Sequence, residues 1–405
     1  MRLDYTPEQE QLRDEIRATM EQVMTPERQA AVSERVEGGP AVRECVRALA
    51  AADLLGVGWP KEFGGRGFSA IEQFIFAEEA RRVNAPIPLV TLNTVGPTLM
   101  QFGTEEQKQT FLPAILEGSV EFAIGYSEPE AGSDLASLRT TAVRDGDDYL
   151  INGQKMFTSG AAYADYIWLA ARTDPNTKKH KGISIFIVPT ASPGFSWQPL
   201  HTMPGISTFY TFYDDVRVPA SAIVAGENQG WQLITTQLNF ERAALGNLSA
   251  LEPLFEQTLQ WAISTELDHG RVIDQPWAQL TLARVEAQVA AYKLINLRVN
   301  AAMTKGGGNI GLKMSEASAA KVFGTELTQQ VAGQLLEVLD HNGLRRGADA
   351  PLRGALESAY RIAVISTFGG GANEIQRDII AMAGLGMPRA PRDLRATEKS
   401  GGPTQ

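Results

Sequence analysis

Cysteine is nearly absent from this chain: Cys45 is the only one among 405 residues. A single thiol excludes an intrachain disulfide, and this composition is typical of a reducing cytoplasm. No run of apolar residues reaches the roughly 18 needed for a membrane-spanning helix. The first residues, MRLDYTPEQEQ, also lack the apolar segment of a signal peptide. We therefore expect a cytoplasmic protein without a membrane span.

Positive charge is in deficit, with 37 Lys and Arg against 47 Asp and Glu and a net charge of −10. This balance argues against nucleic acid and anionic membranes as main partners. Histidine is also scarce, and no two of the four lie at a spacing typical of metal ligands. We therefore expect no metal site among His180, His201, His269 and His341.

The length and the 43% hydrophobic composition suffice for two or three packed units. The first third has the pattern of helices. Each of three capping boxes places a Ser or Thr three residues before a Glu or Gln, which marks a helix start. These boxes are Thr6 with Gln9, Ser69 with Glu72, and Thr104 with Gln107.

The pattern changes near Glu121 to strands and turns, and it keeps this character to about Gly226. Hairpin turns are predicted at Asp145-Gly146 and Asn152-Gly153. The predicted strands cover residues 121–127, 138–144, 166–171, 183–188 and 209–218. A β unit between helical units is therefore expected, in the form of a small barrel or sandwich.

Helical periodicity returns after Trp231, and Pro253 is expected to kink the first helix. The predicted helices cover residues 230–265, 275–304, 315–339 and 352–368, with a last one after Asn373; residues 305–309 are expected to form a flexible joint. The fold class is thus α+β. It comprises an N-terminal helical domain (1–120), a middle β domain (121–229), a C-terminal helical-bundle domain (230–389) and a disordered tail (390–405).

Residues 235–250 (TTQLNFERAALGNLSA) form the most informative stretch of this last helical region. Glu241 and Arg242 interrupt an otherwise apolar helical pattern there. A carboxylate in such a setting is costly unless it is paired or used in chemistry. Taken alone, Glu241 is better explained as a helix-surface residue with an ordinary salt link, because isolated charges are usually solvated.

Six motifs, in order, resemble those of the acyl-CoA dehydrogenase family. They are GWPKEFGGRG (58–67), FGTEEQKQTFL (102–112), YSEPEAGSD (126–134), INGQKM (151–156), GENQGW (226–231) and EIQR (374–377). The helical, β, helical order is also that of the family. The resemblance implies an N-terminal helical domain, a middle β-barrel domain and a C-terminal four-helix bundle. It also implies FAD, an acyl-CoA thioester as substrate, and formation of a double bond between the α and β carbons.

The family match suggests which residue is the catalytic base. Many members carry the base as a Glu in a segment just before the EIQR-like motif, and here that place is taken by Gly370 within Gly369–Ala372. Branched-chain and long-chain members instead use a Glu just before an Arg in the helix after the β unit. Glu241-Arg242 matches that arrangement, so the resemblance implies Glu241 as base. The backbone N–H of Gly370 is then expected to donate to the thioester carbonyl. The absence of a side chain there favours an α-branched or wide acyl group.

The remaining site residues follow from the resemblance position by position. Tyr126 and Ser127 match the pair at the flavin pyrimidine edge, Phe157 replaces a tryptophan stacked on the isoalloxazine, and Ser159 matches the hydroxyl residue at flavin N5. The cofactor set is completed by Gly132, Thr158, Ala372 and Glu374. The substrate set is Ser133, near the CoA portion, with Arg242 and Arg377.

Two family motifs that lend residues to a neighbouring subunit's FAD are altered. The Arg of R-x-x-F-G is displaced within Gly270–Asp274, with Ile-Asp in place of Phe-Gly, and the Gly-rich loop reads Asp340–Gly343. An acidic side chain beside a pyrophosphate is repulsive. The altered motifs therefore predict a different partner subunit that has both of them intact. It resembles the catalytic-type subunit of actinobacterial steroid side-chain acyl-CoA dehydrogenases, which are α2β2 heterotetramers. An electron-transfer flavoprotein is the electron acceptor that the family implies.

Three alternatives stay open. An ordinary branched-chain or long-chain acyl-CoA dehydrogenase has the same motifs. A flavin-dependent acyl-CoA oxidase differs in the reaction of its reduced flavin with O2, and such oxidases are usually longer. A non-catalytic subunit that binds acyl-CoA or a partner would contain no flavin even with its partner present.

Overall fold

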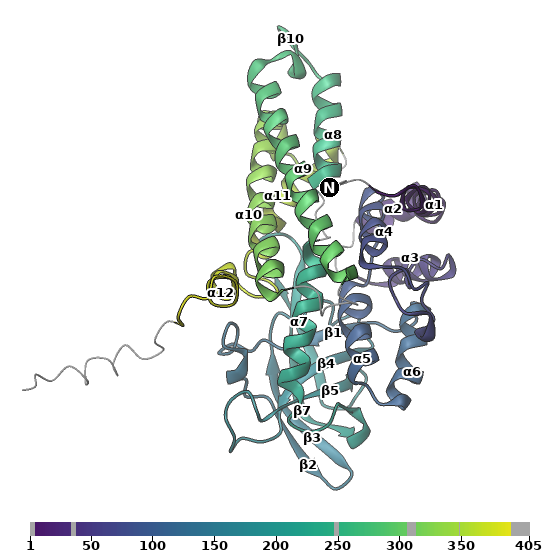
Figure 1. The fold of residues 1–405 in the computed structure, drawn as a ribbon, viewed down its shortest axis with the longest axis vertical. Helices are drawn as coiled ribbons and strands as arrows, with labels where there is room; N and C mark the ends of the chain where they lie inside the picture. Colours follow the sequence, from purple (N-terminus) through teal and green to yellow (C-terminus); the bar gives the residue numbers. More distant parts are fainter. Residues whose placement is uncertain (1–4, 34–37, 247–250, 306–312, 348, 390–405) are drawn as a thin grey trace, which may run out of the picture.

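The computed structural model describes residues 5–33, 38–246, 251–305, 313–347 and 349–389, without the side chains of 33, 239–246 and 305. The expected flexible joint falls largely, and the expected disordered tail wholly, outside these residues. A helical layer beside the sheet, the sheet itself and a tall helical bundle succeed one another along the chain (Figure 1). The α+β class and the helical, β, helical order are therefore confirmed.

All three predicted helix starts are confirmed, each with its capping box formed. At Thr6, for example, the hydroxyl oxygen accepts from the Gln9 backbone N–H while the Gln9 side chain accepts from the Thr6 N–H. These reciprocal bonds satisfy two donors that the helix would otherwise leave unpaired. The N-terminal helices are α1 (Pro7–Val23), α2 (Pro26–Ser33), α3 (Pro40–Ala51), α4 (Ala70–Arg82), α5 (Gly96–Phe102) and α6 (Glu105–Leu116).

Eight strands of the described chain form one mixed sheet in the order β6-β7-β3-β2-β4-β5-β8, with β1 also paired to β4. The strands are β1 (Phe122–Gly125), β2 (Thr141–Asp145), β3 (Asp148–Lys155), β4 (Tyr166–Arg172), β5 (Ile183–Pro189), β6 (Phe195–His201), β7 (Ser207–Pro219) and β8 (Ile223–Val224). One edge of β4 is shared by two parallel neighbours: β1 pairs with its first four residues and β2 with Arg172. The other edge pairs along its whole length with β5.

One predicted hairpin turn is correct and the other is wrong. Asp145-Gly146 lies in the turn that joins β2 and β3, which pair antiparallel. Asn152-Gly153 instead lies inside β3, where the register with β7 shifts between Ile151 and Gly153. Gly153 has a φ of 143°, and a Cβ there would lie 2.7 Å from Thr140 Cα. The glycine thus allows a bulge and a close backbone approach rather than a chain reversal.

The C-terminal part is a helical bundle with a short hairpin at its far end (Figure 1). Its elements are α7 (Gly230–Gly246), α8 (Leu251–Ser264), β9 (Glu266–Leu267), β10 (Gly270–Arg271), α9 (Pro276–Lys305), α10 (Met314–Leu339), α11 (Ala355–Ser366) and α12 (Asn373–Ile379). Pro253 lies in α8, directly after residues 247–250, which are outside the described part of the chain, so the kink expected there stays a prediction. Among the described helices, none is long and apolar enough to cross a membrane.

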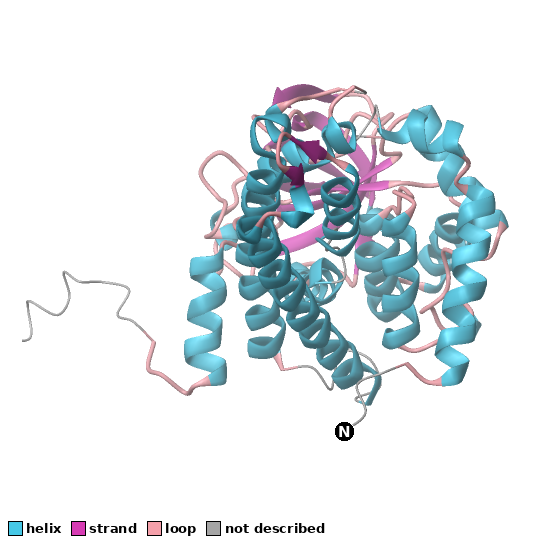
Figure 2. Cartoon of the chain, turned by 90° about the horizontal axis from the view of Figure 1, so that it is seen from above, coloured by secondary structure: helices cyan, strands magenta, loops and turns pink. Residues whose placement is uncertain are grey.

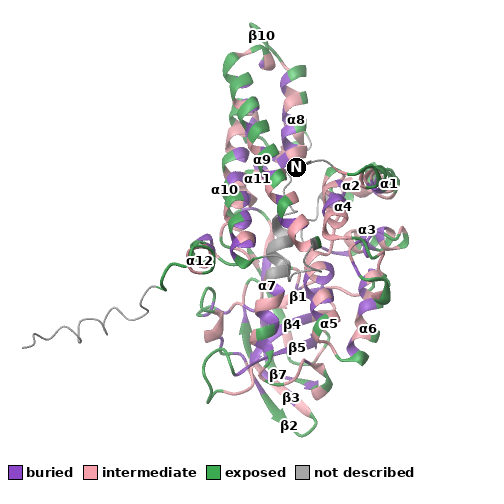
Figure 3. Cartoon of the chain, in the orientation of Figure 1, coloured by how far each residue is buried: buried purple, intermediate pink, exposed green. Residues whose placement is uncertain are grey.

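Two cores flank the sheet and a third fills the bundle. Alternate residues of β4 point to opposite faces, so Trp168 packs with the N-terminal helices and α7, whereas Ile167 and Leu169 pack in the sheet's other core. The bundle core joins α8 to α11 and includes Val285, Val331 and Leu335. In the view from above, helices pack around the sheet (Figure 2). The buried residues lie mainly in the strands and on the inner faces of the helices (Figure 3). α7 lies between the sheet and the bundle, which places it at the junction of the three parts.

Candidate active site

The loop that follows β1 is tied to α7 through a buried polar cluster. The Tyr126 hydroxyl donates to Gln237 Oε1 and accepts from Trp168 Nε1 at 3.1 Å. Trp168 Nε1 also donates to Gln237 Oε1 at 2.9 Å. Gln237 lies on α7 four residues before Glu241, so this cluster fixes the helix to the sheet one turn before the predicted base.

A buried ion pair also holds the loop that follows β1. Lys155 Nζ lies 2.7 Å from Glu128 Oε1 and donates to the Tyr126 carbonyl at 3.1 Å. Glu128 also accepts from the backbone N–H groups of Arg139 at 2.6 Å and Thr140 at 2.9 Å. Burial lowers the pKa of Lys155 to about 8. Burial alone would raise the pKa of Glu128, but Lys155 and the Thr140 donors hold it below its ordinary value.

Neither member of this pair was among the predicted site residues. Both lie inside motifs that the sequence had singled out, YSEPEAGSD and INGQKM, 27 positions apart. A charged residue at an inward position of a strand is the signal that could have revealed Lys155. Its partner is not readable from sequence, because the pairing depends on the loop after β1 lying against the end of β3, where the Met156 N–H donates to the Ser127 carbonyl at 2.9 Å.

The turn after β3 exposes an aromatic ring beside three hydroxyl groups. Phe157 is 55% exposed and has a φ of 59°, an uncommon conformation for a residue with a side chain. The next two residues hold the turn on β7. The Thr158 N–H donates to the Phe209 carbonyl at 3.0 Å, and Ser159 Oγ lies 3.0 Å from Thr208 Oγ1. Phe157 and Ser159 are therefore exposed on one turn, whereas the Thr158 side chain between them is buried.

The second half of the YSEPEAGSD loop is open to solvent. Gly132 and Ser133 are exposed, and a Cβ on Gly132 would meet nothing within 4 Å. The adjacent Asp134 carboxylate pairs with Lys179 at 3.0 Å. The loop thus has a braced inner half, Tyr126 and Ser127, and an accessible outer half.

The segment before α12, which contains the predicted site residues Gly370 and Ala372, is hydrogen-bonded, among the described residues, to α10 and not to the sheet. Buried Lys321 of α10 donates to the carbonyls of Thr367 and Gly371 and to Asn373 Oδ1, at 3.2, 2.8 and 2.8 Å. Gly370 lies within the segment that these bonds fix and has a φ of 65°, in the left-handed region that favours glycine.

Three further predicted site residues, Ala372, Glu374 and Arg377, lie at the start of α12 or within it. Ala372 is the residue that precedes the helix, and Glu374 is exposed in its first turn. Arg377 pairs with Glu326 of α10 at 2.6 Å, and the same Glu326 oxygen accepts from Asn373 Nδ2 at 3.0 Å. α12 is therefore oriented by polar contacts to α10.

The predicted base and its neighbour, Glu241 and Arg242, belong to the last two turns of α7. Their side chains lie outside the described residues. The backbone therefore places both positions at the junction of sheet and bundle, and their roles stay predictions.

Two altered motifs, which in the family contribute residues to the FAD of a neighbouring subunit, lie on exposed parts of the bundle. The Arg271 guanidinium donates through one edge, its Nε–H and Nη2–H groups, to the two oxygens of the Asp274 carboxylate of the same chain, at 3.0 and 2.9 Å, and these bonds raise its pKa. Asp340 has an 82% exposed side chain and a φ of 52°. The arginine is thus occupied within its own chain, and the loop presents a carboxylate to solvent.

Comparison with known proteins covers nearly the whole chain. The acyl-CoA dehydrogenase N-terminal, middle and C-terminal domain families match residues 6–119, 123–216 and 228–385. Acyl-CoA dehydrogenases FadE26 and FadE29 of Mycobacterium tuberculosis are 51% and 48% identical to it. Each alignment covers 97% of this chain and 100% of the relative.

Two solved structures share the fold at high identity. A chain of the ChsE4-ChsE5 complex from Mycobacterium tuberculosis aligns with a TM-score of 0.89 at 50% identity, covering 96% of this chain and 100% of that one. A chain of the Tcur3481-Tcur3483 steroid ACAD aligns with the same TM-score at 48% identity and the same coverage. The expected resemblance is confirmed over the full length: the chain belongs to the acyl-CoA dehydrogenase family and is an acyl-CoA dehydrogenase.

Proposed function

We propose that this chain catalyses FAD-dependent α,β-dehydrogenation of a bulky acyl-CoA thioester, of the steroid side-chain type, with Glu241 as the base. The observation that carries this proposal is its full-length similarity, near half identity, to a chain of a steroid ACAD. Gly370 adds a second reason, because the position used by many relatives for the base has no side chain here. The single buried Cys45 is in keeping with a cytoplasmic enzyme.

The turn after β3 fits a planar aromatic cofactor. An exposed aromatic ring is costly in water unless something covers it, and aromatic rings pair favourably with one another. Phe157 provides such a ring, and Thr158 and Ser159 place hydrogen-bonding groups beside it. Tyr126 and Ser127 provide backbone groups from the braced loop, and Ala372 and Glu374 complete the set from α12. When bound, FAD supplies the acceptor for the hydride that leaves the β carbon.

The chain's own chemistry is the removal of the α proton. A thioester α proton is only weakly acidic, so the carboxylate that takes it must be held close to the α carbon in a site from which water is excluded. Glu241 is assigned this role, with the polar cluster at Gln237 fixing its helix to the sheet. The backbone N–H of Gly370 is assigned to the thioester carbonyl, where a hydrogen bond stabilises the charge that develops on oxygen. Ser133, Arg242 and Arg377 are assigned to the substrate.

A different second subunit is part of the proposal. An arginine already bound by Asp274 has little capacity left to neutralise a neighbour's pyrophosphate, and exposed Asp340 would repel it. The two similar structures, the ChsE4-ChsE5 complex and the Tcur3481-Tcur3483 steroid ACAD, are each named after two different chains. We therefore assign this chain to an α2β2 heterotetramer whose other subunit lends the missing half of the flavin site. An electron-transfer flavoprotein takes the electrons.

The test is reduction of the purified complex by a steroid side-chain CoA thioester without oxygen, monitored by the flavin absorbance. Glu241→Gln is expected to keep its flavin but lose reduction by at least about 10²-fold, in line with removal of a positioned base. Glu286→Gln, an exposed position on α9, is the matched control and should be reduced at the normal rate. Normal turnover by Glu241→Gln would exclude Glu241 as the base. A complex without flavin would favour a non-catalytic subunit.

A further inference from the structure

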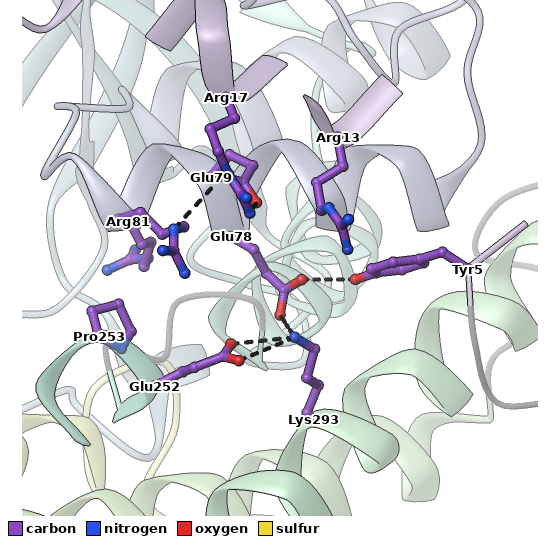
Figure 4. Close-up of a pocket in the computed structure, with 10 residues that line it drawn as sticks. Tyr5, Arg13, Arg17, Glu78, Glu79, Arg81, Glu252, Pro253 and Lys293 are labelled. Carbon is purple, nitrogen blue, oxygen red and sulfur yellow. Dashed lines mark hydrogen bonds and ion pairs between the residues drawn. The ribbon is translucent and has the colours of Figure 1, made fainter. Parts of the chain in front are cut away.

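A cavity of about 150 Å³ lies between the N-terminal helices and the bundle, away from the elements of the proposed active site. α1 and α4 form one wall, and α8 and α9 form the other. Figure 4 shows the side chains of both walls turned toward one another. Five cationic side chains and three carboxylates line it, together with Tyr5 and a single apolar residue, Pro253.

Each lining carboxylate already has a cation or a donor from the same chain. The Glu79 carboxylate accepts from the Nε–H and Nη2–H of Arg17, which lie on one edge of the guanidinium, each at 2.8 Å. Glu78 accepts from the Tyr5 hydroxyl at 2.7 Å and lies 3.3 Å from Lys293 Nζ. The same lysine lies 3.2 Å from Glu252. None of the three is therefore available to neutralise a further cation.

Two guanidinium groups have donors that these carboxylates do not use. Within the described part of the chain, the guanidinium of Arg81 makes no hydrogen bond or ion pair, and burial lowers its pKa to about 10. That direction is expected for a cation withdrawn from water without a counterion. Arg13 has only Asp14, at 3.5 Å, as a charged neighbour among the described residues, and its buried Nε–H has no acceptor.

We propose that this cavity binds a small dianion, of the phosphate or short dicarboxylate class, through Arg13 and Arg81. Guanidinium groups present N–H pairs whose geometry matches carboxylate and phosphate oxygens. A cavity of this volume holds a ligand about the size of benzene, which excludes a steroid or a CoA thioester. The polar lining excludes an apolar acyl tail. The site is thus separate from the proposed reaction and does not depend on it.

Such a ligand would join two parts of the fold. Arg13 and Arg81 belong to α1 and α4, while Lys293, the cation of the opposite wall, belongs to α9. Because the folded chain binds the ligand and the unfolded chain does not, saturation raises Tm. For a chain of this size the expected rise is about 2–5 °C at saturation.

The test is thermal unfolding of the full-length protein, with calorimetry, in sodium phosphate and in sodium succinate, against sodium chloride at matched ionic strength and pH. The wild type and Arg298→Gln, an exposed control on α9, are expected to show the rise with at least one of the two anions. Arg81→Gln and Arg13→Gln are expected to bind the same anion at least tenfold more weakly than the wild type does. Arg81→Gln should also unfold at a higher temperature than the wild type without ligand, because it removes an unpaired charge.

The two anions separate the two ligand classes, since the one that saturates at the lower concentration identifies the chemistry. No rise beyond the chloride control with either anion would overturn the proposal. An equal rise in wild type and Arg81→Gln would overturn it as well, because the binding would then lie elsewhere.

Discussion

At the scale of single residues, Lys155 shows how the fold supports the loop that the cofactor is proposed to contact. Its ammonium is completely withdrawn from solvent and joins Glu128 to the Tyr126 carbonyl. Removal of one member of a buried ion pair leaves the other charge buried without compensation. The pair therefore matters both for the stability of the β unit and for the position of Tyr126.

We expect Lys155→Met to lower the free energy of unfolding by about 3–5 kcal/mol, the cost of an uncompensated buried carboxylate. The matched control is Lys179→Met, because Lys179 pairs with Asp134 at the surface, where ion pairs contribute about 0–1 kcal/mol. Denaturant unfolding of both variants measures the difference. Equal losses would show that the Lys155–Glu128 pair has no special role.

Phe157 allows stability and cofactor binding to be separated. Its positive φ costs about 1–2 kcal/mol, a cost that glycine does not carry. Phe157→Gly is therefore expected to raise the Tm of the flavin-free protein while it weakens FAD binding by up to about tenfold through loss of the ring. Phe157→Leu keeps the strained backbone and serves as control. Titration with FAD and thermal unfolding check both effects, and unchanged FAD affinity in Phe157→Gly would remove this residue from the flavin site.

At the scale of elements, local signals in the sequence were reliable where the structure depends on local contacts. The capping boxes at Thr6, Ser69 and Thr104 correctly predicted helix starts, because their hydrogen bonds involve residues three positions apart. The Asn-Gly turn in β3 was wrong because pairing with β7, some sixty residues later, decided its conformation. β6 was missed: it contains a proline and is mostly exposed, so it lacks the alternation of a half-buried strand.

The same distinction applies to the candidate site. The family resemblance predicts Tyr126, Phe157 and Ser159 as site residues. In the structure, these positions are held by contacts with residues outside the motifs. Gln237 and Lys321 fix the surrounding elements, yet each does so through partners that lie 46 to 111 residues away. Such partners follow from tertiary packing and have no signature in a single sequence.

Glu357 on α11 connects the bundle to the β unit. It accepts from Arg361 at 2.8 and 2.9 Å and from Arg346 at 2.8 Å, and Arg361 also donates to the Met203 carbonyl before β7. Hydrogen bonds from Arg361, with those from Arg346, hold the pKa of Glu357 below its ordinary value of 4.5. A depressed carboxyl pKa stabilises the fold above the unfolded-state pKa, and that contribution is lost as the pH falls through the folded-state value.

We therefore expect Glu357→Gln to cost about 1.5–3 kcal/mol at pH 7, the range for hydrogen bonds to a charged group. The difference from wild type should begin to shrink as the pH falls below 4.5, the ordinary pKa, and should vanish below the lower folded-state pKa, where the wild-type carboxyl is protonated in both states. Urea unfolding at several pH values measures it. A difference that stays constant down to pH 3 would show that the charge of Glu357 does not contribute.

At the scale of the whole molecule, the two surfaces proposed to contribute to flavin sites are unequal. The surfaces proposed to receive FAD are braced by buried contacts, as at Tyr126 and Lys321. The surfaces expected to serve a neighbour's FAD have Arg271 bound to Asp274 and Asp340 exposed. A homotetramer would need both halves from this one chain, whereas a heterotetramer needs only the first.

The most direct test of this account is the flavin content and native mass of the chain, purified alone and after co-expression with a homologous second subunit. We predict little or no FAD for the chain alone, and an α2β2 complex with fewer flavins than chains after co-expression. Stoichiometric FAD in a homotetramer of this chain alone would contradict the account, because Arg271 and Asp340 would then serve a neighbour's flavin after all.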